Sequence, residues 1–193
     1  MSTSREQTDQ LLEIIAGNRW LNDVLAAVQT VRLPSWVVGA GVIRSVVWDH
    51  LHGYDEPTPV NDVDVAFFDP GDTSRERDFA IEQRLITLIP DVPWEVTNQA
   101  GVHLWYEAKF GYPIRPLESI EDAVAMWPET ATSVGVTLDQ ADRPRIVAPL
   151  GLDDLLGMVL RRNRRQVTHE YFLERLHEKR ITQRWPLVRV IDG

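Results

Sequence analysis

Hydrophobic residues at helical spacing open the chain. Over residues 5–30, leucine, isoleucine and valine recur every three or four positions, which predicts one amphipathic helix with a buried face. Short apolar runs then alternate with further helical patterns. They predict buried strands at 36–38, 63–68 and 94–97, and helices at 42–51 and 74–89. The first half of the chain therefore alternates between helix and strand.

The patterns in the second half predict a different arrangement. Helices are expected at 102–110, 119–127, 152–160 and 169–181, and residues 133–138 and 145–147 are expected to pair as a hairpin. The predicted fold class is α/β (α+β), with a short mixed sheet flanked by helices. We expect an α/β domain over residues 1–150, which includes the N-terminal helix, and a C-terminal helical part over 151–193 packed on it.

The composition is that of an ordinary globular protein, with 44% hydrophobic and 25% charged residues among 193. No apolar run approaches the roughly 20 residues that a membrane helix needs, so no membrane association is expected. The absence of cysteine excludes disulfides and thiolate metal sites. The first residues contain no hydrophobic export signal, and we expect a cytoplasmic protein.

The net charge of −9 is unevenly distributed. Residues 156–193 hold nine basic and four acidic residues, a balance of +5, which leaves −14 for residues 1–155. A body this acidic would repel a long phosphate backbone, so long nucleic acid is not an expected partner. The arginines at 161, 162, 164 and 165 could hold a phosphate or a short acidic partner. The favoured interpretation is a solvated helix end, stabilised by the helix dipole.

Two aspartates open the strand predicted at 63–68. Because side chains alternate along a strand, Asp62 and Asp64 point to one face, while Val63, Val65 and Phe67 point to the core. Two adjacent carboxylates repel each other and are costly to desolvate, and a divalent cation offsets both costs. Carboxylate oxygens are the ligands that Mg²⁺ prefers, and Mn²⁺ accepts the same set.

A third carboxylate would complete this set, and Glu95 is the candidate because it lies inside the next predicted strand. The pattern therefore predicts a metal site made by Asp62, Asp64 and Glu95. The alternative is purely structural: Asp62 ends a strand and Glu95 faces solvent.

A glycine turn, Gly39-Ala40-Gly41, joins the first strand to the next helix. Such a turn lets the backbone approach a ligand closely, and the helix N-terminus offers free N–H groups to a phosphate. Arg44, on the first turn of that helix, adds a positive charge. One loop is therefore predicted to hold phosphates while the carboxylates hold the metal. The combination of the two motifs favours this functional interpretation over the structural one.

These residues resemble a known family. The glycine turn with Arg44, the close of the helix at 51–53 and the Asp-x-Asp stretch at 61–65 resemble the head motif of the polymerase-beta-type nucleotidyltransferases, including the tRNA-terminus-adding enzymes. Longer stretches resemble a narrower group of bacterial nucleotidyltransferase-like proteins of unassigned function. These stretches are 47–51, 94–100, 127–132 and 148–154.

The resemblance implies a short mixed sheet of the nucleotidyltransferase type with C-terminal helices. It implies that Asp62, Asp64 and Glu95 bind Mg²⁺ or Mn²⁺ and act in catalysis. The turn at 39–41 would line the triphosphate of an NTP, with Arg44 beside it. The resemblance thus implies a metal-dependent nucleotidyltransferase that moves a nucleotidyl group from an NTP to an unknown small-molecule or protein acceptor.

The chain departs from the family pattern in three places. The turn reads Gly-Ala-Gly instead of a paired glycine or glycine-serine, the loop at 55–60 is longer, and Ser45 stands where tRNA-adding enzymes often have aspartate. These departures favour a second hypothesis, an inactive module of the same fold that binds a nucleotide or a partner. A third hypothesis is a structural domain with no ligand. The acceptor, the base and the oligomeric state are not determined by the sequence.

Several other side chains have two interpretations each. Lys109 and Arg115 could meet a triphosphate or lie in solvated loops. Trp94 and Trp105 could stack on a base, although packing in the core is the favoured role for both.

Overall fold

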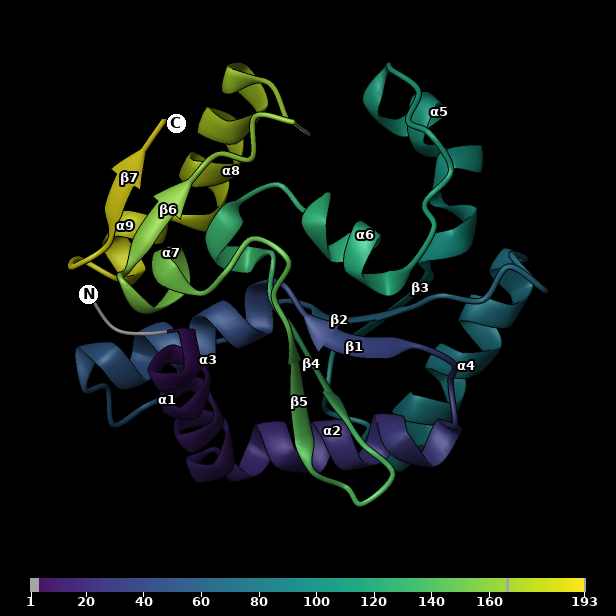
Figure 1. The fold of residues 1–193 in the computed structure, drawn as a ribbon, viewed down its shortest axis with the longest axis horizontal. Helices are drawn as coiled ribbons and strands as arrows, with labels where there is room; N and C mark the ends of the chain where they lie inside the picture. The colour runs from purple at the N-terminus through teal and green to yellow at the C-terminus, as the bar shows by residue number, and fades with distance from the viewer. Residues whose placement is uncertain (1–3, 166, 193) are drawn as a thin grey trace.

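A five-stranded mixed sheet forms the centre of the molecule (Figure 1). The computed structural model describes residues 4–165 and 167–192. The strands lie in the order β3-β2-β1-β4-β5, with β2 and β3 parallel and the other pairs antiparallel. Their bounds are β1 Trp36–Gly39, β2 Val63–Phe67, β3 Trp94–Asn98, β4 Gly135–Leu138 and β5 Pro144–Val147. The predicted mixed sheet and the predicted hairpin are confirmed.

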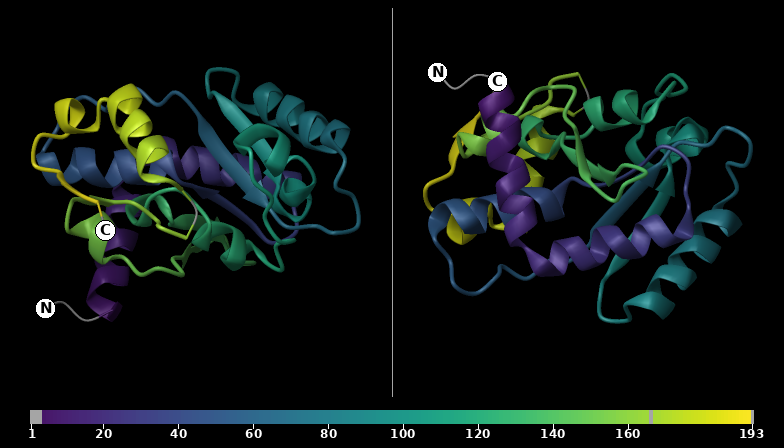
Figure 2. Two further views of the ribbon diagram at one scale, coloured as in Figure 1. Left: turned by 90° about the horizontal axis from the view of Figure 1, so that it is seen from above. Right: turned by 60° about the horizontal axis from the view of Figure 1, so that its bottom comes forward.

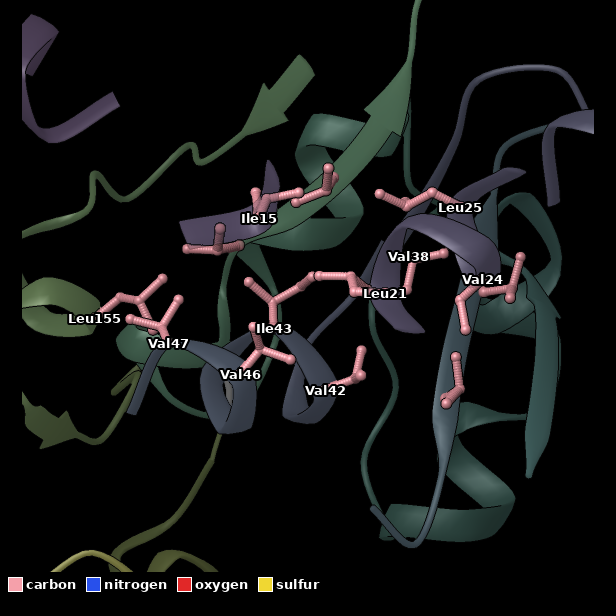
Figure 3. Close-up of a cluster of buried hydrophobic side chains, with 14 of the residues drawn as sticks. Ile15, Leu21, Val24, Leu25, Val38, Val42, Ile43, Val46, Val47 and Leu155 are labelled. Carbon is pink, nitrogen blue, oxygen red and sulfur yellow. The ribbon is translucent and has the colours of Figure 1, made fainter. Parts of the chain in front are cut away.

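The apolar side chains of four long helices form the main core. These helices are α1 Ser4–Gly17, α2 Arg19–Val31, α3 Gly41–His52 and α4 Arg75–Leu88. Of these, α2, α3 and α4 pack against one face of the sheet, and α1 packs on α2 and α3. Figure 2 shows α2 and α4 side by side across the sheet. Val63, Val65 and Phe67 of β2 all point into this core, as their alternation predicts. Figure 3 shows α2 and α3 meeting around Leu21 and Ile43.

The single helix predicted over 5–30 is wrong, because the chain breaks at Asn18. The Asn18 side chain accepts a hydrogen bond from the Leu21 N–H at 2.9 Å and so begins α2 as its N-cap. Asn22 donates its amide to the carbonyls of Ile15 and Ala16, which satisfies the end of α1. The break lets α1 turn away and pack on α3.

The opposite face of the sheet is covered by shorter elements. They are η1 Gln99–Leu104, α5 Tyr106–Phe110 and α6 Ile120–Ala125, whereas η2 Thr130–Thr132 contacts α3 and joins the main core. The helix predicted over 102–110 is therefore a 3₁₀ turn followed by a short helix. From α6, Ile120 and Val124 pack on Val37 and Ala66 of the sheet.

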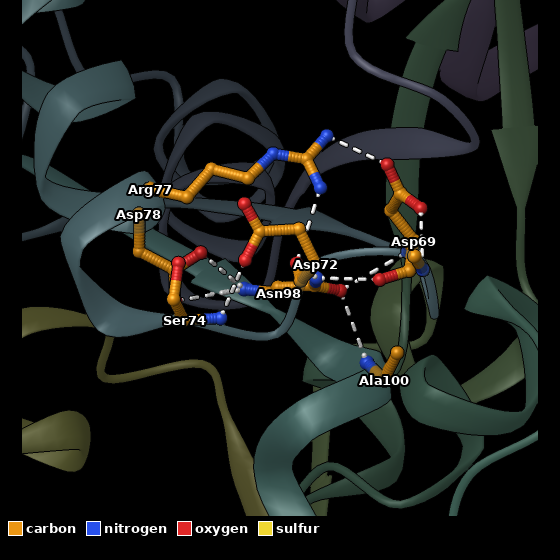
Figure 4. Close-up of polar contacts among 8 residues, drawn as sticks. Asp69, Asp72, Ser74, Arg77, Asp78, Asn98 and Ala100 are labelled. Atoms are coloured by element: carbon orange, nitrogen blue, oxygen red, sulfur yellow. Dashed lines mark hydrogen bonds and ion pairs between the residues drawn. The ribbon is translucent and has the colours of Figure 1, made fainter.

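Asn98 anchors the start of this covering segment (Figure 4). Its side chain accepts hydrogen bonds from the N–H groups of Asp69 and Ala100, at 3.0 and 3.2 Å. It donates to the carbonyls of Asp69 and Asp72, at 2.7 and 2.8 Å. The end of β3 is thereby tied to the loop after β2, so η1 leaves the sheet in a defined direction.

The C-terminal part is not purely helical, which corrects one expectation. The helix predicted over 152–160 is a single turn, α7 Asp153–Leu156, and the chain then forms strand β6 Val159–Arg161. This strand pairs in parallel with β7 Arg189–Ile191, so a distant partner overrides the local helical pattern. The helix predicted over 169–181 is confirmed as α8 His169–Lys179, followed by α9 Ile181–Arg184.

The predicted division at residue 150 stays a prediction. Leu155, Phe172 and Trp185 belong to the same hydrophobic core as α1 to α4, so the two parts share one interior. Residues 1–3, 166 and 193 of the predicted ranges lie outside the described residues. Among the described helices, none combines the length and the apolar character needed to cross a membrane.

Candidate active site

The pairing of three neighbouring strands brings the predicted carboxylates to the glycine turn. Gly39 of β1 lies opposite Asp64 of β2, and Asp64 lies in register with Glu95 of β3. A cavity of about 280 Å³ opens beside them. Six of the seven predicted site residues line it, namely Ala40, Gly41, Arg44, Asp62, Asp64 and Glu95.

Gly39 is the exception, and its surroundings explain why it is glycine. It is buried, and a Cβ at this position would lie 2.3 Å from a ring atom of Trp127. Any larger residue would push this ring off the sheet. The predicted contact of Gly39 with a triphosphate stays a prediction.

The turn itself has an unusual backbone. Ala40 has a φ of 57°, in a region that L-residues other than glycine rarely adopt. Its N–H donates to the carbonyl of Val134 at 3.2 Å, which holds the turn against the strand beside it. The N-cap residue of α3 is Ala40, whose side chain cannot accept a hydrogen bond. The backbone N–H groups in the first turn of α3 are therefore not capped by a side chain of the N-cap residue.

The carboxylates form a region of concentrated negative charge. Burial, together with the charges of Asp62 and Glu95, raises the pKa of Asp64 to about 7. Lys179 lies 3.3 Å from an oxygen of Asp62, whereas Glu95 is exposed on the edge strand. In residues 4–165 and 167–192, no three acidic or histidine side chains are already gathered closely enough to hold a metal ion. The donor set nevertheless fits a hard divalent cation, which would lower the cost of ionising Asp64.

This raised pKa predicts how stability depends on pH in metal-free protein. In the unfolded chain Asp64 loses its proton near pH 3.8, whereas in the folded state it keeps this proton up to about pH 7. The contribution of Asp64 to the free energy of unfolding therefore falls as the pH rises through this window, by on the order of 2 kcal/mol. Urea unfolding in a chelator at about pH 5 and about pH 8 would measure it. Asp64→Asn should lack this component, and identical pH profiles for the two proteins would contradict it.

Arg44 is a buried cation that borders the cavity. Its side chain is only 6% exposed, and its guanidinium lies over the rings of Trp48 and Trp185, 5.2 and 4.5 Å from their centroids. Burial lowers the pKa of Arg44 to about 10. Within the described residues, its Nε has no hydrogen-bond partner and no carboxylate lies within ion-pair distance. An unpaired buried guanidinium bordering a cavity indicates an anion site.

The helix α8 supplies site residues that sequence reasoning missed. Tyr171, Arg175 and Lys179 are spaced four apart, so one face of the helix points them all into the cavity. The Arg175 Nε donates to Glu129 at 2.7 Å, and although burial opposes its charge, Glu129 raises the pKa of Arg175. The basic excess after residue 155, together with this spacing, was the signal that could have found them.

The other candidate cations are now placed. Lys109 lines the cavity, whereas Arg115 pairs with Asp122 at 2.6 Å. The favoured interpretation placed the arginine cluster at a helix end, and this is wrong. Arg161 lies at the end of strand β6, and Arg162 follows it directly. They pair with Asp154 and Asp192, respectively.

The two tryptophans have different surroundings. Trp94 belongs to the main core, as the favoured interpretation held. Trp105 is half-buried and lines a second cavity next to the first.

The fold defines a class of protein. A solved structure described as revealing a CCA-adding enzyme head domain superposes with a TM-score of 0.76, at 25% identity over 96% of both chains. A CCA-adding enzyme in complex with CTP has a TM-score of 0.54 at 15% identity, covering 95% of this chain and 43% of the other. The architecture is therefore that of a nucleotidyltransferase head domain.

The sequence family agrees with this class. A family model described as Nucleotidyltransferase matches residues 26–190, so the chain belongs to this nucleotidyltransferase family. Among proteins of curated function, none matches the chain. Family and fold together support nucleotidyl transfer as the class of activity.

Proposed function

We propose that the protein is a metal-dependent nucleotidyltransferase that moves a nucleotidyl group from an NTP to a small-molecule or protein acceptor. The observation that carries this proposal is the unpaired, buried guanidinium of Arg44 in the same cavity as Asp62 and Asp64. Among the described residues, the guanidinium of Arg44 has no carboxylate within ion-pair distance, and of the three carboxylates Asp62 alone has a lysine, Lys179, within that distance. Such a set is complementary to a metal–triphosphate. The CTP complex of a structurally similar enzyme supports an NTP as the substrate.

Each group has a defined part in this proposal. Arg44, Arg175 and Lys179 would hold the phosphates, and the amides of the glycine turn would add hydrogen bonds. Asp62, Asp64 and Glu95 would hold Mg²⁺ or Mn²⁺, which neutralises charge on the transferring phosphoryl group when bound. The glycine turn and Asp64 lie opposite each other, so phosphates bound at the turn lie beside the carboxylates.

The acidic surface supports the choice of acceptor. The net charge of −9 would repel a long RNA, so a small molecule or a protein is the better acceptor.

Binding of the metal–nucleotide is the first test. With an NTP at about 100 times its dissociation constant, the melting temperature should rise by about 5 to 10 °C, because such a ligand adds roughly 2.7 kcal/mol. The rise should require Mg²⁺ or Mn²⁺ and should be lost in Asp64→Asn. Asp23→Asn, an exposed position on α2, is the matched control and should keep the rise. No shift with any NTP and metal would reject the proposal.

The inactive-module hypothesis remains the second candidate, because Ala40 occupies the strained turn position where glycine would be relaxed. Metal-dependent NTP binding without pyrophosphate release in any acceptor mixture would favour it.

A further inference from the structure

A second cavity adjoins the first on the face of the sheet opposite the long helices. Its volume is about 360 Å³, and it lies among η1, α5, α6 and α8, which Figure 1 shows on one side of the sheet. The two cavities share part of their walls, including Asp64, Thr97, Phe110 and Trp127. A molecule in the second cavity would therefore lie directly beside the proposed catalytic carboxylate Asp64.

The walls of the two cavities differ in chemistry. The first contains the cations Arg44, Arg175 and Lys179. Of the described residues that line the second, Asp64 alone carries a charge. The rest of the wall is aromatic or apolar, with hydroxyl and amide groups such as Thr168 and Gln99. The described residues that line this wall include no cation, and Lys109, whose ammonium lies over the rings of Trp105 and Phe110, lines the first cavity. A triphosphate or a nucleic-acid backbone therefore fits the first cavity better than the second.

Six of the described residues that line this wall carry aromatic rings. Tyr106 lies 4.4 Å from the ring of Phe110 and 5.5 Å from that of Tyr112, measured between centroids. The ring of Phe110 lies 6.0 Å from that of Tyr171, so the series crosses from α5 to α8. Rings arranged in this way fit a planar or apolar ligand body by stacking and edge contacts.

From this arrangement we propose that the second cavity is the acceptor subsite, and that the acceptor is an uncharged hydroxyl compound with an aromatic or apolar body. The inference rests on the proposed function. In nucleotidyl transfer the attacking oxygen and the leaving pyrophosphate lie on opposite sides of phosphorus. Asp64 borders both cavities, whereas Asp62 and the cations Arg44, Arg175 and Lys179 border only the first. If the cations hold the pyrophosphate in the first cavity, the acceptor oxygen has to approach from the opposite side, where the second cavity lies.

The reaction balances without a further reagent. The acceptor oxygen forms a bond to the α-phosphorus, and the bond between this phosphorus and the bridging oxygen to the β-phosphorus breaks. Pyrophosphate leaves with the electron pair of the broken bond. The hydroxyl proton passes to a carboxylate at the cavity border and then to water. The products are the nucleotidylated acceptor, pyrophosphate and one proton.

A substitution that fills part of the second cavity tests its assignment as the acceptor subsite. Ala123 of α6 is 1% exposed and lines only the second cavity, so Ala123→Leu should fill it without touching the carboxylates. With 4-methylphenol as the probe, ligand-observed NMR should detect binding to the wild type and at least about tenfold weaker binding to this variant, because steric filling removes the ligand volume. Binding of a non-hydrolysable α,β-methylene NTP with Mg²⁺ should change by less than about twofold.

A second variant covers the case in which Ala123→Leu does not fold. Trp105→Ala removes one ring from the cavity edge and should weaken 4-methylphenol binding by about three- to tenfold. Leu104→Ala is its matched control, because Leu104 is 68% exposed and does not line the cavity, and it should leave binding unchanged.

The outcomes separate this inference from the proposed function. Equal loss of nucleotide-analogue binding in Ala123→Leu would show that the cavity holds the base, which overturns the acceptor subsite and keeps the transferase. Absence of 4-methylphenol binding to the wild type also overturns the subsite alone. If the wild type binds 4-methylphenol but no nucleotide with any metal, the proposed function fails and the acceptor assignment falls with it.

Discussion

Replacing Asp64 with asparagine is expected to lower the rate of nucleotidyl transfer by about a thousandfold or more. Asp64 borders both cavities and lies in register with Glu95, so it occupies the centre of the carboxylate set. An amide of the same shape keeps the packing but removes the charge that a divalent cation needs. The loss corresponds to about 4 kcal/mol of transition-state stabilisation.

The measurement is transfer of label from α-³²P NTPs into an extract that contains small molecules and proteins, together with pyrophosphate release. Asp23→Asn is the control for a general effect of removing a carboxylate. Unfolding cannot account for the loss, because Asp64→Asn relieves charge repulsion and should be at least as stable as the wild type at about pH 8. Transfer at the wild-type rate would remove Asp64 from the mechanism.

Replacing Glu129 with leucine is expected to lower the free energy of unfolding by about 3 to 5 kcal/mol, a fall of roughly 10 °C in melting temperature. Glu129 is only 4% exposed, and it accepts hydrogen bonds from Arg175 and from the hydroxyl of Thr132 at 2.8 Å. Its removal leaves a half-buried guanidinium without its counter-charge beside that of Arg44.

Thermal and urea unfolding would measure this effect. The double variant Glu129→Leu with Arg175→Leu should recover more than half of the loss, because no unpaired charge then remains between them. Arg115→Ala breaks the more exposed pair with Asp122 and should cost less than about 1 kcal/mol. Equal costs for Glu129→Leu and Arg115→Ala would show that burial does not govern the Glu129 pair.

Local rules were sufficient for the five strands of the main sheet and for the placement of the carboxylates. Alternation along β2 requires Asp62 and Asp64 to leave the core on one face while Val63 and Val65 enter it. The turn could be recognised from the sequence Gly39-Ala40-Gly41, although the residue that takes a positive φ there is Ala40. These features depend on residues close together in the chain, so they can be predicted from the amino-acid sequence without the tertiary structure.

Local rules failed where a polar side chain or a distant strand decided the structure. Asn18 ends one helix and begins the next through its own side-chain hydrogen bond, although the apolar spacing continues past it. Residues 159–161 carry a helical pattern but pair with 189–191, because backbone pairing and shared burial outweigh a weak local preference.

Short stretches of sequence thus determine the carboxylate pair, the turn and the strands of the main sheet, because strand alternation and turn chemistry act over a few residues. The cavity around them was decided only by the tertiary structure. Lys179 reaches Asp62 across 117 positions, and the Trp185 indole donates to Asp49 across 136. The aromatic wall likewise joins α5 to α8. Contacts between such distant residues depend on how the whole chain packs, and no local pattern specifies them.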